Sequence, residues 1–333
     1  LVTRVERISR STSGGARAGV LVGAGNTLAE LSAPDVADGL NLMHFPDSPE
    51  EYAVNDELAG NPLLFPWANR LAARSGYSFA GNRVDFPPLN HPNAPAYLLD
   101  DHGLPLHGLL TKSEAWRTVT LGEDMHLARH EWPTAHPRFA CYPFAHALEM
   151  RHTLRDCDSG PGVTLKVELS VTNTGPGTLP LSFGFHPYFA GGSSARHEAI
   201  LDLPLRSHIQ TDERLIPNGR LQPLHELWPD HRSLRLSEDL QIDHGFTGLL
   251  REGAASERAL PLVLRTPDRE VAVRFGPEYR VAVVYAPLPE AGREYFVCFE
   301  PMLAPTNALA QTPAVLAAGQ SIQVSFEIEA RPN

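Results

Sequence analysis

The sequence predicts an all-β protein, a large antiparallel β-sandwich, and three observations support this fold class. Two stretches alternate apolar and polar side chains, which is the pattern of half-buried strands. The 30 prolines and 26 glycines are scattered over the 333 residues, so long uninterrupted helices have few places to form. Further β-rich runs follow at short intervals, which favours a sandwich or barrel over alternating strands and helices. We expect residues 1–333 to form one domain.

The clearest strand covers residues 163–172, where five apolar residues alternate with five polar ones. The turn-forming run Asn-Thr-Gly-Pro-Gly at residues 173–177 ends it. The same period of two returns at residues 322–328, where apolar residues again occupy every second position. We therefore expect a closing strand near the end of the chain.

Shorter runs rich in β-branched and aromatic residues predict the remaining strands. These runs are residues 116–121, 145–154, 262–266, 271–275 and 281–285. Two segments, residues 48–58 and 304–310, are candidates for short helices, and residues 190–195 are typical of a loop. No repeat at a fixed period marks a second domain.

The charge distribution bears on the partners that the protein can have. The formal net charge is −11, and lysines and arginines form no run that follows a phosphate backbone or an anionic membrane. We expect neither nucleic acid nor a membrane as a partner. The first fifteen residues lack the apolar run of a secretory signal, and no stretch is long enough to span a bilayer. We therefore expect a cytoplasmic location.

The cysteines and histidines do not follow a metal-binding pattern. Cys141, Cys157 and Cys298 form no C-x-x-C pair, and their odd number leaves at least one thiol outside an intramolecular bridge. We expect all three to be small apolar side chains in or near the core. The histidines show no standard ligand spacing either, so we expect no metal and no cofactor.

Five short segments place a polar or ionisable residue among aromatic and turn residues, the composition expected where an apolar cleft holds a polar ligand. They are FPWANRLA, PLHGLL, FGFHPYF, IDHGF and CFEPMLAPTNAL, in chain order. Two tryptophans, Trp67 and Trp116, are suited to stacking on a sugar ring, but core packing is their more common role.

Two ionisable residues of these segments are candidates for proton transfer. His186 precedes a proline, which favours an extended backbone, and an imidazole exchanges protons at neutral pH. Glu300 follows an apolar run and precedes Pro301, so we expect it at the end of a strand, at the rim of a sheet. Burial there raises the pKa of a carboxyl group, whereas hydrogen bonds hold it ionised. A structural histidine and a paired carboxylate are the alternatives.

Three further residues are candidates for binding a polar ligand. Arg70 carries five N–H donors that match hydroxyl groups, although a plain salt bridge is the alternative. His107 precedes Gly108, which leaves room for a ligand to approach closely, and a buried structural histidine is the alternative. Asp243 is suited to binding paired hydroxyls, and an exposed turn aspartate is the alternative.

Taken together and in this order, the five segments resemble the aldose 1-epimerase, or galactose mutarotase, family over roughly residues 60–310. The resemblance implies the family's fold, a galactose mutarotase-like supersandwich with a ligand cleft on a concave sheet. It also implies that His186 and Glu300 are catalytic and that Arg70, His107 and Asp243 bind the substrate. Pro187 and Pro301, directly after the two catalytic-type residues, are departures from the best-known mutarotases.

The family's reaction interconverts the α and β anomers of a hexose such as galactose or glucose. Glu300 would take the proton of the O1 hydroxyl while His186 protonates the ring oxygen, so the ring opens to the aldehyde. Rotation about the C1–C2 bond and reclosure then give the other anomer. Arg70 and His107 would orient the sugar.

Other functions remain open on the sequence alone. A sugar-binding or regulatory protein without activity keeps the same cleft. An epimerase of hexose 6-phosphates belongs to a related branch, but the acidic net charge and the lack of an arginine cluster argue against a phosphosugar. A glycoside hydrolase would use two carboxylates such as Asp243 and Glu300. Either a monomer or a homodimer is compatible with the sequence.

Overall fold

A computed structural model describes residues 5–10, 15–87, 97–158, 160–253, 256–290 and 294–333. Strands make up most of the structured residues, and the helices are short. The helical segments are α1 (Pro49–Val54), α2 (Leu224–Leu227), α3 (Ala308–Gln311), and three 3₁₀ turns at Ala37–Gly39, Phe139–Cys141 and Arg196–Glu198. No helix in the described part of the chain has the length and apolar character needed to cross a bilayer.

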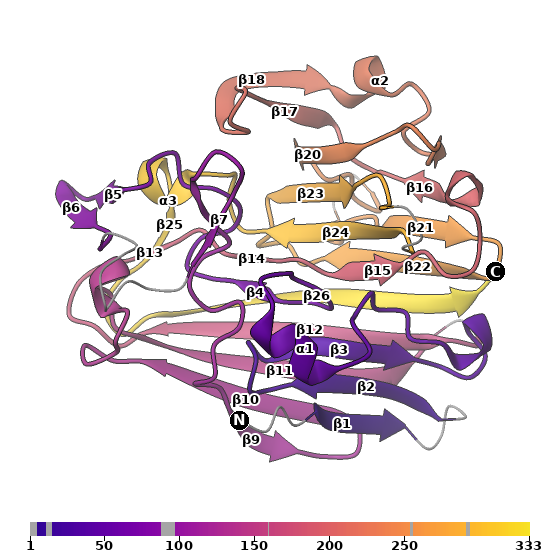
Figure 1. Cartoon of the computed structure of the whole chain (residues 1–333), viewed down its shortest axis with the longest axis horizontal. Helices are drawn as coiled ribbons and strands as arrows, with labels where there is room; N and C mark the ends of the chain where they lie inside the picture. The colour runs from indigo at the N-terminus through magenta and orange to yellow at the C-terminus, as the bar shows by residue number, and fades with distance from the viewer. Residues whose placement is uncertain (1–4, 11–14, 88–96, 159, 254–255, 291–293) are drawn as a thin grey trace.

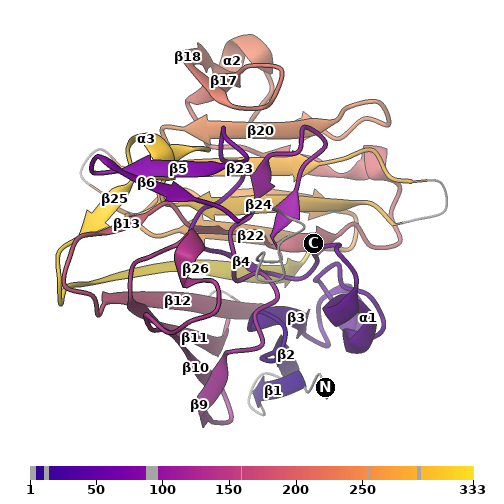
Figure 2. The same ribbon diagram turned by 60° about the vertical axis from the view of Figure 1, so that its left-hand side comes forward.

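Two large antiparallel sheets dominate the described structure (Figures 1 and 2). The nine-stranded sheet runs, in spatial order, β19 (Leu234–Arg235), β16 (Ile200–Asp202), β21 (Leu262–Thr266), β22 (Arg269–Phe275), β26 (Ser321–Pro332), β12 (Val163–Asn173), β11 (His146–Asp156), β10 (Met125–Trp132) and β9 (Arg117–Leu121). β9 lies at the bottom of Figure 1.

The second large sheet has eight strands, and it carries the candidate site described below. Its spatial order is β18 (Pro217–Pro223), β17 (Ser207–Thr211), β20 (Ile242–Thr247), β23 (Val281–Ala286), β24 (Phe296–Met302), β14 (Gly184–Phe185) and β4 (Leu63–Leu64), with β15 (Tyr188–Ala190) pairing β24 beside β14. The hairpin of β17 and β18 lies with α2 at the top of Figure 1.

Smaller sheets complete the described structure. They are β1 (Val5–Arg10) with β2 (Ala16–Leu21) and β3 (Thr27–Ser32), then β5 (Gly76–Phe79) with β6 (Asn82–Asp85), β7 (Leu98–Leu99) with β8 (Pro105–Leu106), and β13 (Leu179–Leu181) with β25 (Ala314–Leu316). The β1–β3 sheet lies near β9–β11 in both views.

The structure confirms the predicted fold class and the predicted strands. The two alternating stretches form β12 and β26, which pair with each other from Val163↔Ala330 to Thr172↔Ser321. The helical prediction for residues 48–58 is confirmed only over α1, where Ser48 caps Glu51 with its hydroxyl. The prediction for residues 304–310 is shifted, because α3 begins only at Ala308.

The core lies between the two large sheets, and this decides which side chains remain for the cleft. Side chains of β12 and β26 pack in one apolar cluster with the convex face of the eight-stranded sheet, as the Phe185–Phe326 ring contact illustrates. In β24, Val297 and Phe299 belong to this cluster. The alternate residues of β24 therefore point to the opposite, concave face. All three cysteines are buried and free, as expected.

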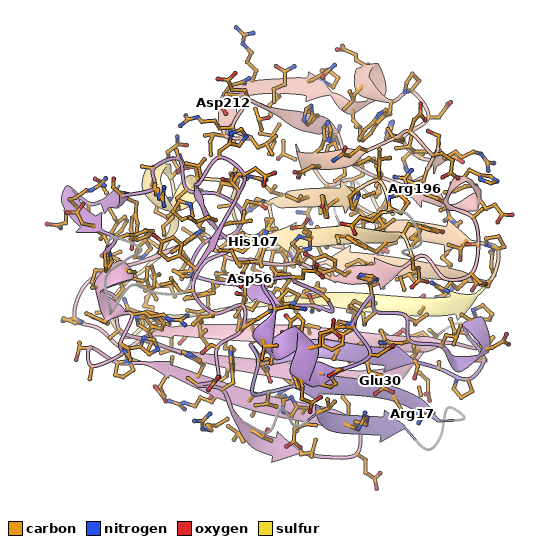
Figure 3. All side chains as sticks on the ribbon, in the orientation of Figure 1. Arg17, Glu30, Asp56, His107, Arg196 and Asp212 are labelled. Carbon is orange, nitrogen blue, oxygen red and sulfur yellow. The ribbon has the colours of Figure 1, made fainter. Side chains whose placement is uncertain are left out.

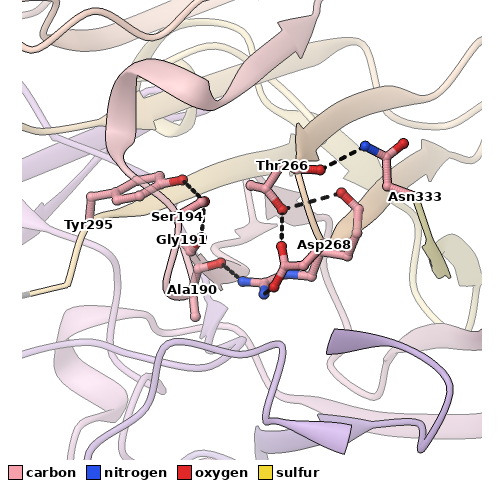
Figure 4. A network of polar contacts seen from close by, with 8 residues as sticks. Ala190, Gly191, Ser194, Thr266, Asp268, Tyr295 and Asn333 are labelled. Carbon is pink, nitrogen blue, oxygen red and sulfur yellow. Dashed lines mark hydrogen bonds and ion pairs between the residues drawn. The ribbon is translucent and has the colours of Figure 1, made fainter. Parts of the chain in front are cut away.

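A buried arginine, Arg269, ties the two sheets together, and its partners Ala190 and Asp268 are labelled in Figure 4. Arg269 begins β22 in the nine-stranded sheet, and its guanidinium donates to the Ala190 carbonyl at the end of β15 in the other sheet. Asp268 accepts from the same guanidinium at 2.9 Å. Because an unpaired buried charge is costly, these two acceptors stabilise the arginine where it lies. Nearby, Asn333 donates to the Thr266 carbonyl at 2.9 Å and ties down the end of β26.

Candidate active site

Hydrogen bonds between backbones bring the polar segments together. The segment around Arg70 lies against the segment around His107, because the amide of His107 donates to the Asn69 carbonyl at 2.9 Å. It also lies against the strand before His186, because the amide of Ala68 donates to the Ser182 carbonyl at 2.8 Å. β14 in turn joins β4 to β24, which carries Glu300.

Glu300 lies inside β24 and not at the end of a strand, so the sequence prediction of its position is wrong. It pairs with Val283, and the strand continues through Pro301 to Met302. The proline is tolerated because residues 299–301 lie opposite the gap between β14 and β15, where no ladder bond forms on that side. The Glu300 side chain is thus in the middle of the concave face.

His186 lies directly beside Glu300. Its Nε2 atom is 3.5 Å from Glu300 Oε1, and the two side chains are 6% and 1% exposed, respectively. His186 lies in the gap between β14 and β15, and its backbone amide donates to the Pro62 carbonyl at 3.1 Å. The Tyr188 ring stacks on it at 4.2 Å with an interplanar angle of 7°. The fold therefore holds an acid–base pair in a fixed geometry.

His107 lies edge-on to His186, with 5.3 Å between the ring centroids. Its backbone has a φ of 59°, a left-handed conformation that orients the side chain toward the cleft. Gly108 does not open space for a ligand, contrary to the sequence prediction. A Cβ there would lie 2.2 Å from the Phe65 carbonyl oxygen, and the residue has a φ of +77°. The glycine is required by close backbone packing.

Arg70 is held between two carboxylates. Its Nε donates to Asp100 Oδ2 at 2.8 Å, and its Nη2 lies 3.7 Å from Asp243 Oδ2. Asp100 is fixed in turn by the backbone amides of His102 and Leu104, at 3.0 and 2.8 Å. Asp243 is part of β20 and not of a turn. The guanidinium therefore forms a salt bridge and also lines the cleft.

Burial controls the protonation of these groups. It raises the pKa of Glu300 well above its usual value, with Asp243 adding to the effect and Arg70 opposing it. It lowers the pKa of His186 well below its usual value, and His107 acts in the same direction. The pKa of His107 is lowered to about 3 by burial and by Arg70. Near neutral pH, burial thus favours a neutral imidazole next to a protonated carboxyl group.

The five predicted site residues all line one cleft of about 250 Å³. The other lining residues are Asp56, Leu58, Asn69, Leu98, Leu106, Tyr188 and Tyr285. His107 and Asp56 are labelled in Figure 3, where they mark the position of the cleft in the view of Figure 1. Two polar atoms of the site have no partner within the described protein: Nδ1 of His107 and Oε2 of Glu300. A polar ligand would satisfy such atoms.

Comparison with known proteins agrees with this arrangement. The sequence model of the family described as aldose 1-epimerase matches residues 12–329. The chain belongs to the aldose 1-epimerase family. The match confirms the resemblance to this family that the sequence suggested.

Solved structures show the same fold. The GalM/aldose epimerase homologue from C. elegans matches with a TM-score of 0.77 and 16% identity, over 99% of both chains. A galactose mutarotase-like protein from Clostridium acetobutylicum matches with a TM-score of 0.75 and 16% identity, over 96% of this chain and 94% of the other. Galactose 1-epimerase from Lactobacillus acidophilus NCFM matches with a TM-score of 0.67 and 16% identity, over the whole of both chains.

Some residues of this cleft were missed by sequence reasoning, and two tryptophans were correctly assigned to the core. Asp100 and Tyr285 contact or line the site, but no motif distinguishes them in the sequence. Tyr188 also lines the site, and it lies within the FGFHPYF segment but was not singled out there. Trp67 and Trp116 are buried at 1% exposure, so they pack in the core. Among the described residues, no group of three or more His, Cys, Asp or Glu side chains is placed to hold a metal ion.

Proposed function

We propose that this protein is an aldose 1-epimerase that interconverts the α and β anomers of a neutral hexose. The observation that carries the proposal is the buried contact of 3.5 Å between His186 Nε2 and Glu300 Oε1 at the floor of the cleft. Such a pair can remove one proton and deliver another within a single sugar ring.

Ring opening needs a base at the O1 hydroxyl and an acid at the ring oxygen O5. Ionised Glu300 takes the O1 proton, the C1–O1 bond becomes a carbonyl, and the C1–O5 bond breaks. The O5 atom receives the proton of the His186 imidazolium. The aldehyde then rotates about C1–C2, and the two proton transfers run in reverse to close the ring on the other face.

The electrostatics of the cleft suit this cycle. A neutral imidazole with a protonated carboxyl group, the state that burial favours, has the same number of protons as the ion pair that begins ring opening. The two states differ only by the position of one proton, so neither half of the cycle takes a proton from solvent. Hydroxyl groups of a bound sugar would stabilise the ionised state by hydrogen bonds.

The remaining residues of the site bind and orient the sugar in this proposal. Arg70 and Asp243 together offer donors and an acceptor to the hydroxyls remote from C1. His107, kept neutral by its lowered pKa, accepts or donates one hydrogen bond beside His186. Tyr188 and Tyr285 supply aromatic walls.

The lining favours a neutral sugar over a hexose 6-phosphate. Arg70 is the only lysine or arginine among the residues that line the described cleft, and Asp100 and Asp243 already compensate its charge. A phosphate dianion would therefore meet the carboxylates of Asp56 and Asp243 and no cation free to pair with it among the lining residues.

Polarimetry with a matched pair of variants tests the proposal. Wild-type protein should accelerate the approach of freshly dissolved α-D-galactose or α-D-glucose to the equilibrium rotation. Glu300→Gln should lower kcat by about 10²- to 10⁴-fold, the usual contribution of a positioned base, while sugar binding by calorimetry persists. The exposed Glu226→Gln serves as control and should behave as wild type.

Each alternative function predicts a different outcome. Sugar binding without acceleration by the wild type would indicate a binding protein and refute the proposal. Release of a reducing sugar from an aryl glycoside would indicate a glycoside hydrolase. Full activity of Glu300→Gln would leave the reaction in place but exclude Glu300 as its base.

A further inference from the structure

Tyr188 covers one face of the imidazole that the proposed reaction uses. The rings of Tyr188 and His186 are within 7° of parallel, with 4.2 Å between their centroids. Two further rings lie edge-on to the imidazole, His107 at 5.3 Å and Tyr285 at 6.0 Å, with interplanar angles of 75° and 87°. Of the aromatic contacts that His186 makes in the described part of the chain, the one with Tyr188 is therefore the face-to-face stack.

The hydroxyl group of Tyr188 lies over the reacting nitrogen. Its Oη atom is 3.3 Å from His186 Nε2, the nitrogen that also lies 3.5 Å from Glu300 Oε1. Stacked rings stay about 3.5 Å apart, at the contact distance of their atoms. Because the two planes are nearly parallel, so short a separation places Oη above the nitrogen and not in the plane of the imidazole. Tyr188 therefore leaves the in-plane direction of Nε2, along which a proton is exchanged, to Glu300 and to a sugar.

The surrounding chain fixes Tyr188 in this position. Its amide donates to the Gly60 carbonyl at 2.7 Å, and its carbonyl accepts from the His44 amide at 2.9 Å. Its ring contacts Phe296, with 5.2 Å between the centroids, and the residue is buried. The stack on His186 is therefore part of the fold and does not have to be formed by a ligand.

Ring opening requires a positive charge on this imidazole, and its surroundings oppose that charge. In the proposed cycle, His186 carries a second proton when it delivers one to the ring oxygen. Burial lowers the pKa of His186, which disfavours the imidazolium, and His107 acts in the same direction. Glu300 attracts the imidazolium only while it is ionised, and burial raises its pKa. A neighbour that favours the imidazolium without taking its proton would lower the cost of this state.

Tyr188 has the properties of such a neighbour. A cation over the face of an aromatic ring, within about 6 Å of its centre, is attracted by the electron density of that face. A protonated His186 lies 4.2 Å from the centre of the Tyr188 ring, and the phenol oxygen adds a partial negative charge over Nε2. Burial raises the pKa of the Tyr188 hydroxyl well above its usual value, so this group stays protonated and does not take the proton of the imidazolium.

We propose that Tyr188 is a positioning residue of the reaction, whose ring and hydroxyl oxygen stabilise the imidazolium form of His186 and keep its Nε2 atom beside Glu300. The inference rests on the proposed function and adds a residue to its mechanism. Because the stabilised charge exists only in the reacting state, the loss of Tyr188 acts on kcat, whereas KM depends mainly on the residues that bind the hydroxyl groups.

A series of ring-fluorinated phenylalanines at position 188 tests the proposal. Fluorine withdraws electron density from the face of the ring and hardly changes its shape, so the attraction for a cation weakens stepwise while the packing is kept. Rates of anomer exchange would be measured by NMR over a range of D-galactose concentrations. We expect kcat to fall with each fluorine, by about 10- to 30-fold in total from Tyr188→Phe to the trifluorinated ring, the range of a desolvated cation–π contact. KM should change less than about threefold.

The variant Tyr188→Phe itself isolates the hydroxyl group and should lower kcat by about 2- to 10-fold, the usual effect of one neutral polar contact. The same fluorinated residues at position 189 are the matched control. Phe189 is the next residue of β15, but it points to the opposite face and packs in the core against Phe299. Its variants should keep kcat within about twofold. Thermal melts would show which variants are folded, and the monofluorinated ring, the smallest change, keeps the test decisive if the trifluorinated one does not fold.

The outcomes separate this inference from the proposed function. If the wild type accelerates anomer exchange of neither D-galactose nor D-glucose, the proposed function fails, and the role of Tyr188 fails with it. If the wild type is active but kcat does not depend on the number of fluorines at position 188, or falls equally in the series at Phe189, only the inference about Tyr188 is overturned.

Discussion

Acid should destabilise this protein through a layer of four buried histidines. The layer consists of His126 and His130 in β10 and His146 and His152 in β11, each at most 1% exposed. Burial lowers the pKa of His126 and His146 to about 4, and that of His130 and His152 to about 3.

The sign of the effect follows from these pKa values. Between pH 6.5 and about 4, the unfolded chain protonates these histidines while the folded chain keeps them neutral. The stability that they contribute is therefore complete above pH 6.5 and is lost as the pH falls through this window. Each histidine contributes up to about 1.4 kcal/mol per pH unit, so the layer contributes up to about 5 kcal/mol per unit.

Other groups change the net slope. Glu300 and Asp243 have raised pKa values, so the folded state binds protons more readily there and gains stability as the pH falls. A single-variant difference removes this complication. In His152→Leu, the slope of the unfolding free energy against pH should be smaller than in the wild type by about 1 kcal/mol per unit on average between pH 7 and pH 5, and by up to about 1.4 kcal/mol per unit well below pH 6.5.

Urea unfolding between pH 7 and pH 5 measures this slope. His152 suits the test because neither of its ring nitrogens has a hydrogen-bond partner in the described structure, so the leucine variant loses no such bond. The exposed His225→Gln is the control and should keep the wild-type slope. An unchanged slope in His152→Leu would refute the conclusion that burial keeps this imidazole neutral.

Three further predictions concern the cleft. Asp100→Asn should raise KM about 10- to 100-fold and change kcat less than about threefold, because Arg70 loses a charge-assisted partner. Steady-state kinetics measure both constants, and a fall in kcat alone would contradict this prediction. Gly108→Ala should destabilise the protein by about 1–3 kcal/mol in urea unfolding, because the Cβ of the alanine would lie 2.2 Å from the Phe65 carbonyl oxygen. Gly122→Ala is the control, because a Cβ at residue 122 makes only ordinary van der Waals contact. The value of kcat/KM should stay level across neutral pH and fall only where His186 gains a proton in acid or Glu300 loses its proton in base. A fall in kcat/KM with a midpoint near pH 6.5 would contradict these protonation states.

The sequence predicted local structure well where one pattern decides it. The alternation in residues 163–172 follows from one face packing in the core, and β12 extends it by a single residue. The position of Glu300 was predicted wrongly, because a proline such as Pro301 usually marks the end of a strand. Whether a strand tolerates a proline depends on the gap between β14 and β15, which is a property of the folded sheet and not of the local sequence.

The chemistry of the site was accessible from the sequence, but its supporting residues were not. His186, Glu300 and Arg70 are recognisable because their residue types and neighbouring motifs suit proton transfer and hydroxyl binding. Asp100 has no such context, and only the folded chain places it 2.8 Å from Arg70, thirty residues earlier.

The central claim is that this cleft catalyses the interconversion of anomers. The most direct test is NMR magnetisation exchange between the anomeric protons of α- and β-D-galactose at equilibrium. Catalytic amounts of wild-type protein should give exchange cross-peaks, and Glu300→Gln at the same concentration should give none. If folded wild-type protein produced no exchange for D-galactose or D-glucose, the proposed function would be contradicted.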